Sequence, residues 1–278
     1  MTKENVLITG ATSGIGLELA RVFAKNGHSL VLVAPVEAEL KTIASDLESK
    51  YKIEVRYLSA DLSTPDSSIK IVEKLSQLGL QVDILVNNAG FGQKGNFWEV
   101  PLETLLSMIA VNVEAVVGLT HLLLPAMIAR KRGRVLNTAS IAGFQAGPTM
   151  AVYHATKAFV LSLSEALAIE LKDTGVTLTA LCPGPVDTDF FPKAGMVETK
   201  AFQKGNLMAP QEVAAAGYEA LMKGDPLIVP GATNKAMVFS RRFLTEEAQA
   251  KANAKQYEDV PPEDLKRVPG EVAARGRH

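Results

Sequence analysis

Cysteine is almost absent from this sequence of 278 residues, which contains only Cys182. A single cysteine excludes an intrachain disulfide and favours a reducing compartment. Its surroundings, "TALCPG", end an apolar run, so we interpret Cys182 as a buried thiol and not as a nucleophile. The sequence has only four histidines, none at metal-ligand spacing, and it therefore predicts no metal site.

An excess of either charge is also absent, because 29 basic residues face 30 acidic ones. Such a balance gives no general field that would attract nucleic acid or an anionic membrane surface. The start, "MTKENVLITG", lacks a signal-peptide pattern, and we expect no uncharged run long and apolar enough to span a bilayer. We therefore expect a cytoplasmic protein that acts on small molecules, without nucleic acid or membrane partners.

Apolar runs of strand length alternate with helical patterns along most of the chain. The runs are nearly continuous in Val, Ile and Leu, which is typical of strands covered on both faces, and the alternation implies right-handed crossovers. We predict an α/β fold, a doubly wound parallel sheet between two layers of helices. The runs lie at 5–9, 29–33, 53–58, 82–87, 133–140, 176–182 and 226–230, and the helical patterns at 14–26, 37–50, 66–78, 101–129, 151–174 and 210–223.

The C-terminal part of the sequence differs in composition. From Thr245 on it is charged, contains proline and has few large apolar residues. We predict a domain over residues 1–240, with a substrate lid at about 189–208, followed by a charged helix and tail over 241–278. A solvated tail is preferred over a segment that docks a partner, because it can bury little apolar surface.

The first strand is followed by a glycine-rich turn, "TGATSGIG", at 9–16. Gly10, Gly14 and Gly16 would permit a tight turn and let backbone N–H groups approach a pyrophosphate at a helix N-terminus. An ordinary glycine-rich turn is the alternative. The position in the first strand–turn–helix unit favours a dinucleotide site.

Tyr153 and Lys157 lie four residues apart near the start of an apolar helix, so they share one face. The spacing alone also fits a core-edge Tyr and a Lys that reaches solvent. A lysine close to a phenol would lower the pKa of that phenol and bring it toward the working range of an acid–base. Adjacent helix positions point about 100° apart, so His154 cannot share this face.

The ordered motifs resemble those of the single-domain short-chain dehydrogenases/reductases, in the carbonyl-reductase-like branch, over roughly residues 4 to 235. The resemblance rests on "TGATSGIG", "NNAG" at 87–90, Asn112, Ser140, "YHATK" and "PGPVDT" at 183–188. It implies a Rossmann fold and a nicotinamide-dependent oxidoreductase that interconverts a ketone or aldehyde and an alcohol. A catalytically silent nucleotide-binding regulator is the alternative, and the presence of Asn112, Ser140, Tyr153 and Lys157 together favours the enzyme.

The resemblance also implies residue roles. Tyr153 is the expected acid–base, Lys157 binds the nicotinamide ribose, Ser140 holds the substrate oxygen, and Asn112 anchors a water relay or is a buried structural amide. Asp61 is expected against the adenine, with a helix N-cap as its alternative. The expected cofactor-binding residues are Gly10, Thr12, Ser13, Gly14, Ile15, Gly16, Asp61, Leu62, Asn88, Ala89, Gly90, Tyr153, Lys157, Pro183, Gly184, Val186 and Thr188.

We expect an apolar substrate pocket without a fixed charge. Its predicted residues are Phe91, Ile141, Phe144, Pro185, Phe190 and Phe191. The helices at 101–129 and 151–174 carry more apolar surface than one sheet face needs, and relatives of this fold pair such helices, so we expect a homodimer or homotetramer.

The nicotinamide cofactor is less well determined. Relatives that prefer NAD end the second strand with an acid, and those that prefer NADP place an Arg next to it, but this chain has Ala34 and Pro35. Thr12 and Ser13 could bond a 2′-phosphate, whereas Glu37 and Glu39 would oppose it. NADP(H) is narrowly favoured, with NAD(H) as the alternative and modest discrimination expected.

Overall fold

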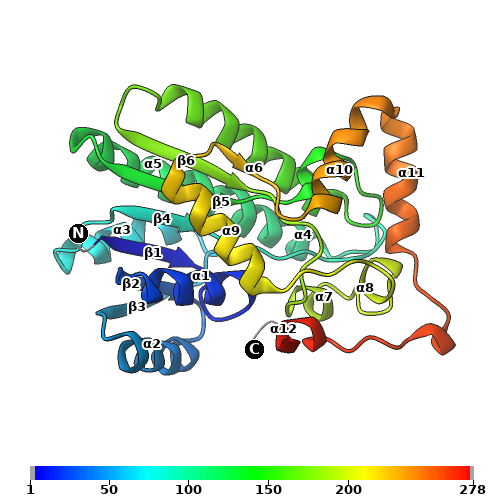
Figure 1. Ribbon diagram of the computed structural model, residues 1–278, viewed down its shortest axis with the longest axis horizontal. Helices are drawn as coiled ribbons and strands as arrows, with labels where there is room; N and C mark the ends of the chain where they lie inside the picture. The colour runs from blue at the N-terminus through cyan, green and yellow to red at the C-terminus, as the bar shows by residue number, and fades with distance from the viewer. Residues whose placement is uncertain (1–3, 276–278) are drawn as a thin grey trace.

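The sheet determines where the ends of the strands meet. The computed structural model describes residues 4–275, and its strands form one parallel sheet in the order β3-β2-β1-β4-β5-β6-β7 (Figure 1). The strands are β1 Asn5–Thr9, β2 Ser29–Ala34, β3 Val55–Ser59, β4 Ile84–Asn87, β5 Gly133–Thr138, β6 Val176–Leu181 and β7 Leu227–Ile228. The chain winds outward in opposite directions from β1 and β4, so a crevice opens at their carboxyl ends. The predicted doubly wound parallel sheet is confirmed.

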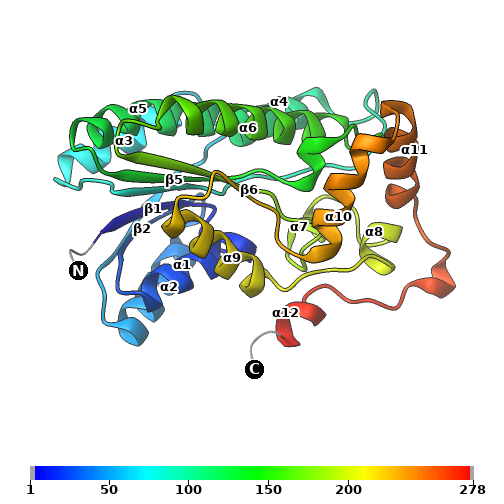
Figure 2. The same cartoon turned by 45° about the horizontal axis from the view of Figure 1, so that its top comes forward.

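Two layers of helices cover the sheet, as Figure 2 shows. One layer consists of α1 Gly14–Lys25, α2 Glu37–Tyr51 and α9 Pro210–Lys223, and the other of α3 Ser67–Gln77, α4 Leu102–Ile109, α5 Ala115–Ala129 and α6 Ala151–Glu170. These bounds agree with the predicted helical patterns to within a few residues. The arrangement is a three-layer α/β/α sandwich.

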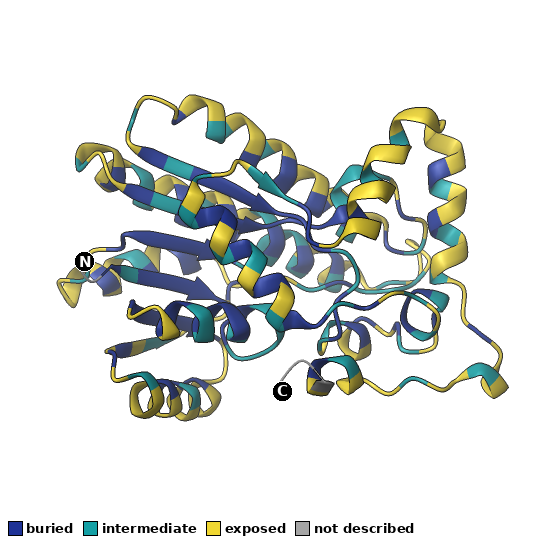
Figure 3. Cartoon of the chain, in the orientation of Figure 1, coloured by how far each residue is buried: buried dark blue, intermediate teal, exposed yellow. Residues whose placement is uncertain are grey.

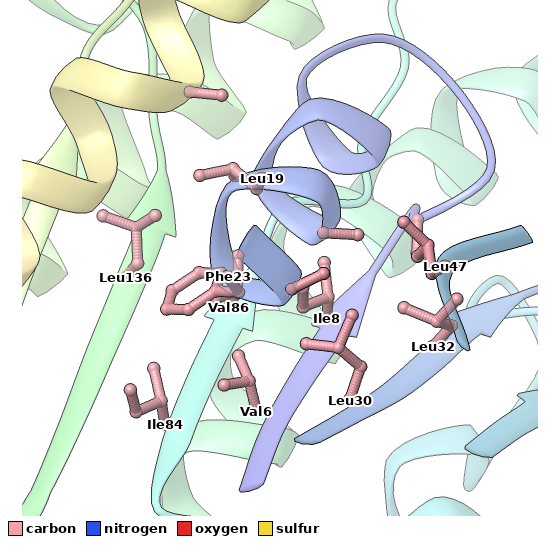
Figure 4. Close-up of a cluster of buried hydrophobic side chains, with 14 of the residues drawn as sticks. Val6, Ile8, Leu19, Phe23, Leu30, Leu32, Leu47, Ile84, Val86 and Leu136 are labelled. Atoms are coloured by element: carbon pink, nitrogen blue, oxygen red, sulfur yellow. The ribbon is translucent and has the colours of Figure 1, made fainter. Parts of the chain in front are cut away.

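Strand residues alternate between two cores. Val6 and Ile8 face Phe23 of α1 in one cluster (Figure 4), and Leu7 belongs to a second cluster on the other face of the sheet. The strands are buried on both sides, whereas the outer faces of the helices are exposed (Figure 3). This two-sided burial explains why the strands are continuous apolar runs in the sequence.

A π-helical turn, η1 Ala110–Glu114, joins α4 to α5 and makes one helical stretch over Leu102–Ala129. Among the described residues this stretch is long and apolar enough to cross a membrane, with a mean hydropathy of 1.7 over its best window. The stretch is not an uncharged run, because it contains Glu103 and Glu114 and its longest uncharged part, Ala115–Ala129, is 15 residues long, so the expectation about uncharged runs is not contradicted. Length and composition are weak evidence for a span, because core helices also meet the criterion, and here α5 packs on β4 and β5 with Leu119 and Met127 fully buried.

The C-terminal third builds a cap over the carboxyl edge of the sheet. The segment expected to form the lid, 189–208, contains α7 Phe190–Lys193 and α8 Lys200–Gln203. It is followed after β7 by α10 Ala232–Ser240, η3 Arg241–Phe243, α11 Glu246–Tyr257, η4 Pro262–Asp264 and α12 Glu271–Arg275. Figure 1 shows the segment after α11 running beneath α8 and α7 before it ends at α12.

The segment after α11 packs against residues 187–205, whereas the sequence predicted a solvated tail. The carboxylate of Asp187, 1% exposed, accepts hydrogen bonds from the backbone N–H groups of Gly270, Val272 and Ala273 at 2.9, 2.7 and 3.1 Å. Arg267 donates to the carbonyl oxygens of Phe202 and Gly205. The prediction fails because these contacts use backbone groups, which composition does not reveal; the tail residues 276–278 lie outside the described chain.

Candidate active site

A cavity of about 820 Å³ lies at the carboxyl ends of the strands, where the sheet order reverses. It extends from the turn after β2, at Pro35, past Gly10 and Tyr153 to Lys204 and Tyr257 of the C-terminal cap. One continuous space therefore joins the glycine-rich turn, the Tyr–Lys helix α6 and the lid. All predicted cofactor-binding residues except Gly16 line it.

The glycine-rich turn has the backbone that an anion site needs. Gly10 and Gly14 have φ angles of +63° and +53°, and a Cβ atom on Gly10 would lie 2.9 Å from Cα of Ala89. Ser13, the residue before α1, makes no side-chain cap hydrogen bond, so the first N–H groups of this 12-residue helix are not capped by it. A pyrophosphate fits this turn by charge and by space.

Gly16 acts differently from the prediction. It does not line the cavity; a Cβ atom there would lie 2.1 Å from the carbonyl oxygen of Gly10. Its role in this structure is to let α1 pack directly on the turn.

Polar side chains join the ends of β1, β4 and β5. The hydroxyl oxygen of Thr9 accepts hydrogen bonds from the N–H groups of Asn88 and Ala89, both at 3.0 Å. The Asn88 amide nitrogen donates to the Thr9 carbonyl at 3.2 Å, and its amide oxygen accepts from the Thr138 hydroxyl at 3.3 Å. Sequence reasoning missed Thr9 and Thr138, whose positions at strand ends were the available signal.

Tyr153 and Lys157 point into the cavity from the first turns of α6. The Lys157 ammonium is buried, donates to the Thr138 carbonyl at 2.7 Å and lies 5.9 Å from the centroid of the Tyr153 ring. Burial lowers the pKa of Lys157 to about 8. Burial likewise raises the pKa of Tyr153 to about 12, and a hydrogen bond with the Ser140 side chain opposes part of that rise.

The expectation that Lys157 lowers the pKa of Tyr153 is therefore wrong for this geometry. Desolvation of the phenol is the larger effect, and the ammonium group is held by a backbone carbonyl instead of by the phenol. Tyr153 is thus a protonated phenol at neutral pH.

Ser140 follows β5 and faces the cavity next to Tyr153. Its oxygen accepts from the N–H of Ala142 at 3.1 Å and its hydroxyl donates to the Pro183 carbonyl at 3.4 Å. The second bond is long, so this hydroxyl can turn toward a bound oxygen.

Asn112 lies in the π-helical turn and does not line the cavity. Its amide pairs with the backbone of Phe91 in both directions, at 2.9 and 3.1 Å, and donates to the Thr156 hydroxyl. The structure thus assigns it the alternative role, a buried amide that holds the loop after β4. A π-turn at this point is common at functional sites, and the water relay stays a prediction.

Asp61 lines the cavity beside the turn after β2 and closes a local turn. One carboxylate oxygen accepts from the N–H and the hydroxyl of Ser63, at 2.9 and 2.7 Å. The N-cap alternative is wrong, because α3 begins at Ser67 after Asp66.

The other end of the cavity is lined by Phe91, Ile141, Pro185, Phe190 and Phe191, as predicted. Phe144 does not line it. Its carbonyl accepts from Arg241, whose guanidinium lies 5.4 Å from the Phe144 ring centroid, so η3 covers this side chain.

The expectation of a pocket without charge is also wrong, because Lys193 and Lys204 line the cavity. Lys204 pairs with Asp264 at 2.7 Å and Lys193 lies 4.0 Å from Asp189, and all four side chains are at least one-third exposed. The cations therefore occupy the rim and the aromatic side chains the interior.

Sequence reasoning missed the contribution of the C-terminal helices. Asn234 and Met237 of α10 and Asn253, Gln256 and Tyr257 of α11 line the cavity. His154 bonds Tyr257 and the backbone of Gln145 but makes no hydrogen bond to Tyr153, as the helix geometry predicted. Within residues 4–275, no three His, Cys, Asp or Glu side chains could hold a metal ion together.

Comparison with known proteins identifies similar chains. The family model described as short chain dehydrogenase matches residues 4–198. The chain is 33% identical over 217 residues to an uncharacterized oxidoreductase of Staphylococcus saprophyticus, an alignment that covers 78% of this chain and 90% of the relative. It is 41% identical over 175 residues to a very-long-chain 3-oxoacyl-CoA reductase of Phaeosphaeria nodorum, covering 61% of this chain but only 51% of the relative. The chain thus spans about half the length of that reductase.

Solved structures share the whole fold. A short-chain dehydrogenase from Sphingobium yanoikuyae in complex with NADPH superposes with a TM-score of 0.77 at 30% identity, covering 92% of this chain and 98% of that one. A relative from Burkholderia phymatum in complex with NAD gives 0.77 at 26% identity, covering 93% and 98%. The bulky-bulky ketone specific alcohol dehydrogenase from Comamonas testosteroni gives 0.74 at 28% identity, covering 87% and 93%.

The buried ammonium predicts a pH-dependent stability. The pKa of Lys157 falls from 10.5 to about 8 on folding, so the unfolded chain binds more protons between these values. The free energy of unfolding should therefore rise with pH in this window, by at most ~1.4 kcal/mol per pH unit. Lys157→Met should lose this rise in urea titrations run from about pH 7.5 to about pH 9.5. Lys25→Met, which removes an exposed ammonium, is the control and should keep it; equal slopes in the parent and Lys157→Met would contradict the assignment.

Proposed function

This chain belongs to the short-chain dehydrogenase/reductase family of oxidoreductases, and from that premise we propose that it interconverts a ketone or aldehyde and an alcohol with a nicotinamide cofactor. The observation that carries the proposal is the single cavity that joins the phosphate-binding turn to Tyr153 and Ser140. A silent nucleotide-binding regulator finds no support in the relatives, which are reductases and dehydrogenases.

The residues of this chain can divide the reaction between them. The glycine-rich turn would hold the pyrophosphate, and Lys157, which lies beside Gly90, would hold the ribose. When it is bound, the nicotinamide exchanges a hydride with the reacting carbon. Ser140 holds the carbonyl oxygen, and Tyr153 donates its phenolic proton to that oxygen as charge develops there. The raised pKa of Tyr153 keeps that proton on the phenol at neutral pH, which suits reduction.

The cavity favours ketones with bulky apolar substituents. Aromatic and sulfur-containing side chains surround the reacting position, among them Phe91, Phe190, Met150 and Met196. The relatives act on a 3-oxoacyl-CoA and on bulky ketones by their names, which supports a large substrate here. Lys193 and Lys204 at the rim could attract an anionic group of the substrate that lies outside the apolar interior.

Replacement of Tyr153 tests the proposed reaction. The parent protein should oxidise NADPH or NADH in the presence of members of a panel of bulky ketones. Tyr153→Phe should lose at least ~4 kcal/mol of transition-state stabilisation, about a thousandfold in kcat/KM, and should still bind the cofactor. Spectrophotometric turnover and cofactor titration check both parts; a variant within tenfold of the parent would remove Tyr153 as the proton donor.

We also propose that the chain discriminates only modestly between NADP(H) and NAD(H). Ala34 ends β2, and Pro35 and Glu39 line the cavity beyond it. In the described part of the chain, the Lys and Arg side chains that line the cavity are Lys157, Lys193 and Lys204, and none belongs to this turn. The free N–H groups at the start of α2 would favour a 2′-phosphate, whereas the Glu39 carboxylate would repel it. The structure therefore adds no support to the narrow preference for NADP(H).

A guanidinium group at the turn after β2 should create a preference for NADPH over NADH. Pro35→Arg should raise kcat/KM for NADPH relative to NADH by about tenfold, the effect of ~1.4 kcal/mol from one charge-assisted contact. Initial rates with both cofactors give this ratio, and Glu39→Gln should move it in the same direction by less. A parent that prefers NADH more than a hundredfold would show that another acid binds the ribose.

Self-association through α4, α5 and α6 is a further proposal. Their outer faces expose Leu102, Leu106, Val117, Phe159 and Ile169, an apolar surface that a second copy could cover. Light scattering at micromolar concentration should give the mass of a dimer or tetramer; a monomer of 29.7 kDa would contradict the proposal. The expected cytoplasmic location stays a prediction from the sequence.

A further inference from the structure

The cavity has a polar wall on the side of the C-terminal helix α11. Gln145, His154, Asn253 and Tyr257 all line the cavity there and are joined by hydrogen bonds. Figure 1 shows α11 standing beside α10 and above α8, at the end of the molecule that carries the lid. None of these four groups has a part in the proton transfer proposed for Tyr153.

The hydrogen bonds of His154 fix the direction of the Tyr257 hydroxyl. Nδ1 of His154 lies 2.7 Å from the Gln145 carbonyl oxygen, which can only accept, so Nδ1 carries the hydrogen. Burial lowers the pKa of His154, so the ring is neutral and its Nε2 atom is an acceptor. The Tyr257 hydroxyl, 2.7 Å from Nε2, must therefore donate to it.

This arrangement leaves the Tyr257 oxygen as an acceptor. Burial raises the pKa of Tyr257, so the phenol stays neutral with its proton committed to His154. Tyr257 therefore cannot be a second proton donor for the reacting oxygen, but its lone pairs remain available to the cavity that it lines.

Gln145 supplies a second acceptor on the same wall of the cavity. Its amide nitrogen donates to the Asn253 side-chain oxygen at 3.0 Å, and the Asn253 nitrogen donates to the Ala146 carbonyl at 2.7 Å. This chain fixes the orientation of the Gln145 amide. Within residues 4–275 no donor bonds its Oε1 atom, although Gln145 lines the cavity.

We propose that Tyr257 and Gln145 form a second polar subsite that accepts a hydrogen bond from a hydroxyl group of the substrate, remote from its carbonyl. The proposal rests on the ketone reduction proposed above and narrows its substrates to bulky ketones that carry a hydroxyl group. The Tyr257 oxygen and the Gln145 Oε1 atom can each accept a hydrogen bond from such a hydroxyl group.

The subsite lies within one side chain of the reaction centre. The His154 ring centroid is 6.1 Å from that of Tyr153 and 5.7 Å from that of Tyr257. A substrate whose carbonyl is held by Ser140 and Tyr153 can therefore place a hydroxyl group on the far side of an aromatic or alicyclic ring against Tyr257.

The test compares two ketones that differ by one hydroxyl group, 4-(4-hydroxyphenyl)butan-2-one and 4-phenylbutan-2-one. Tyr257→Phe keeps the ring and removes the acceptor, so kcat/KM for the hydroxylated ketone should fall about tenfold through KM, while the value for 4-phenylbutan-2-one changes less than twofold. A purely structural role, such as loss of the partner of His154, would lower both values alike. An unchanged ratio of the two values would overturn the proposal.

Tyr218→Phe is a matched control, because Tyr218 also pairs with a histidine, His28, at 3.3 Å but does not line the cavity. It should leave the ratio unchanged. Gln145→Leu is the second variant, in case Tyr257→Phe does not fold, and should lower the ratio in the same direction.

Binding separates this proposal from the proposed reaction. Calorimetric titration of both ketones into protein saturated with the oxidised cofactor, NADP+ or NAD+, gives the same comparison without turnover, because the oxidised nicotinamide has no hydride to transfer. If the parent reduces neither these two ketones nor any member of the panel of bulky ketones, the proposed reaction fails, yet tighter binding of the hydroxylated ketone that is lost in Tyr257→Phe would still support the subsite. Equal binding of both ketones would contradict it.

Discussion

The site depends on the hydrogen bonds that hold the carboxyl ends of β1, β4 and β5 together. The Thr9 hydroxyl accepts hydrogen bonds from the backbone after β4, and the Asn88 amide donates to the backbone of β1. The Thr138 hydroxyl, at the end of β5, donates to Asn88. The ammonium of Lys157 adds α6 to this group through the Thr138 carbonyl. The glycine-rich turn, the floor after β4, Ser140 and Tyr153 therefore have fixed relative positions, which a reaction between two bound molecules requires.

Burial determines the protonation states at this site. It raises the pKa of the Tyr153 phenol and lowers that of the Lys157 ammonium, so each group is biased toward its neutral form. The same effect keeps His154 neutral and Tyr257 protonated on the neighbouring wall beside α11. The interior of the cavity thus offers neutral phenol and imidazole groups beside the Lys157 ammonium, which a pKa of about 8 leaves mostly protonated at neutral pH, whereas Lys193 lies at the rim.

The sequence predicted the parts of the fold that repeat locally. Two-sided burial makes each strand a short apolar run, and the glycine-rich turn, Ser140 and Tyr153 occupy positions set by their own strand or helix. The doubly wound parallel sheet and its two helical layers could be predicted for that reason, and all the residues that the resemblance assigned to the cofactor except Gly16 line the cavity.

The predictions that failed involve contacts between distant segments. Phe144 is covered by Arg241, 97 residues away, and the tail is held by Asp187 through backbone groups 83 to 86 residues away. Tyr257 reaches the cavity from a helix with few apolar residues. No local pattern encodes such contacts. The pKa of Tyr153 was misjudged because spacing reveals its neighbour Lys157 but not the burial that outweighs it.

Isotope transfer tests the central claim most directly, namely that this one cavity brings a nicotinamide and a carbonyl into contact. A bulky ketone would be reduced with NADPH or NADH carrying deuterium on one face of C4, and the alcohol would be analysed by NMR and chiral chromatography. Direct transfer in a fixed geometry predicts that the carbinol carbon of one alcohol enantiomer carries the deuterium, with label from only one face of the cofactor. Label lost to solvent, label from both faces, or a racemic alcohol would contradict the account.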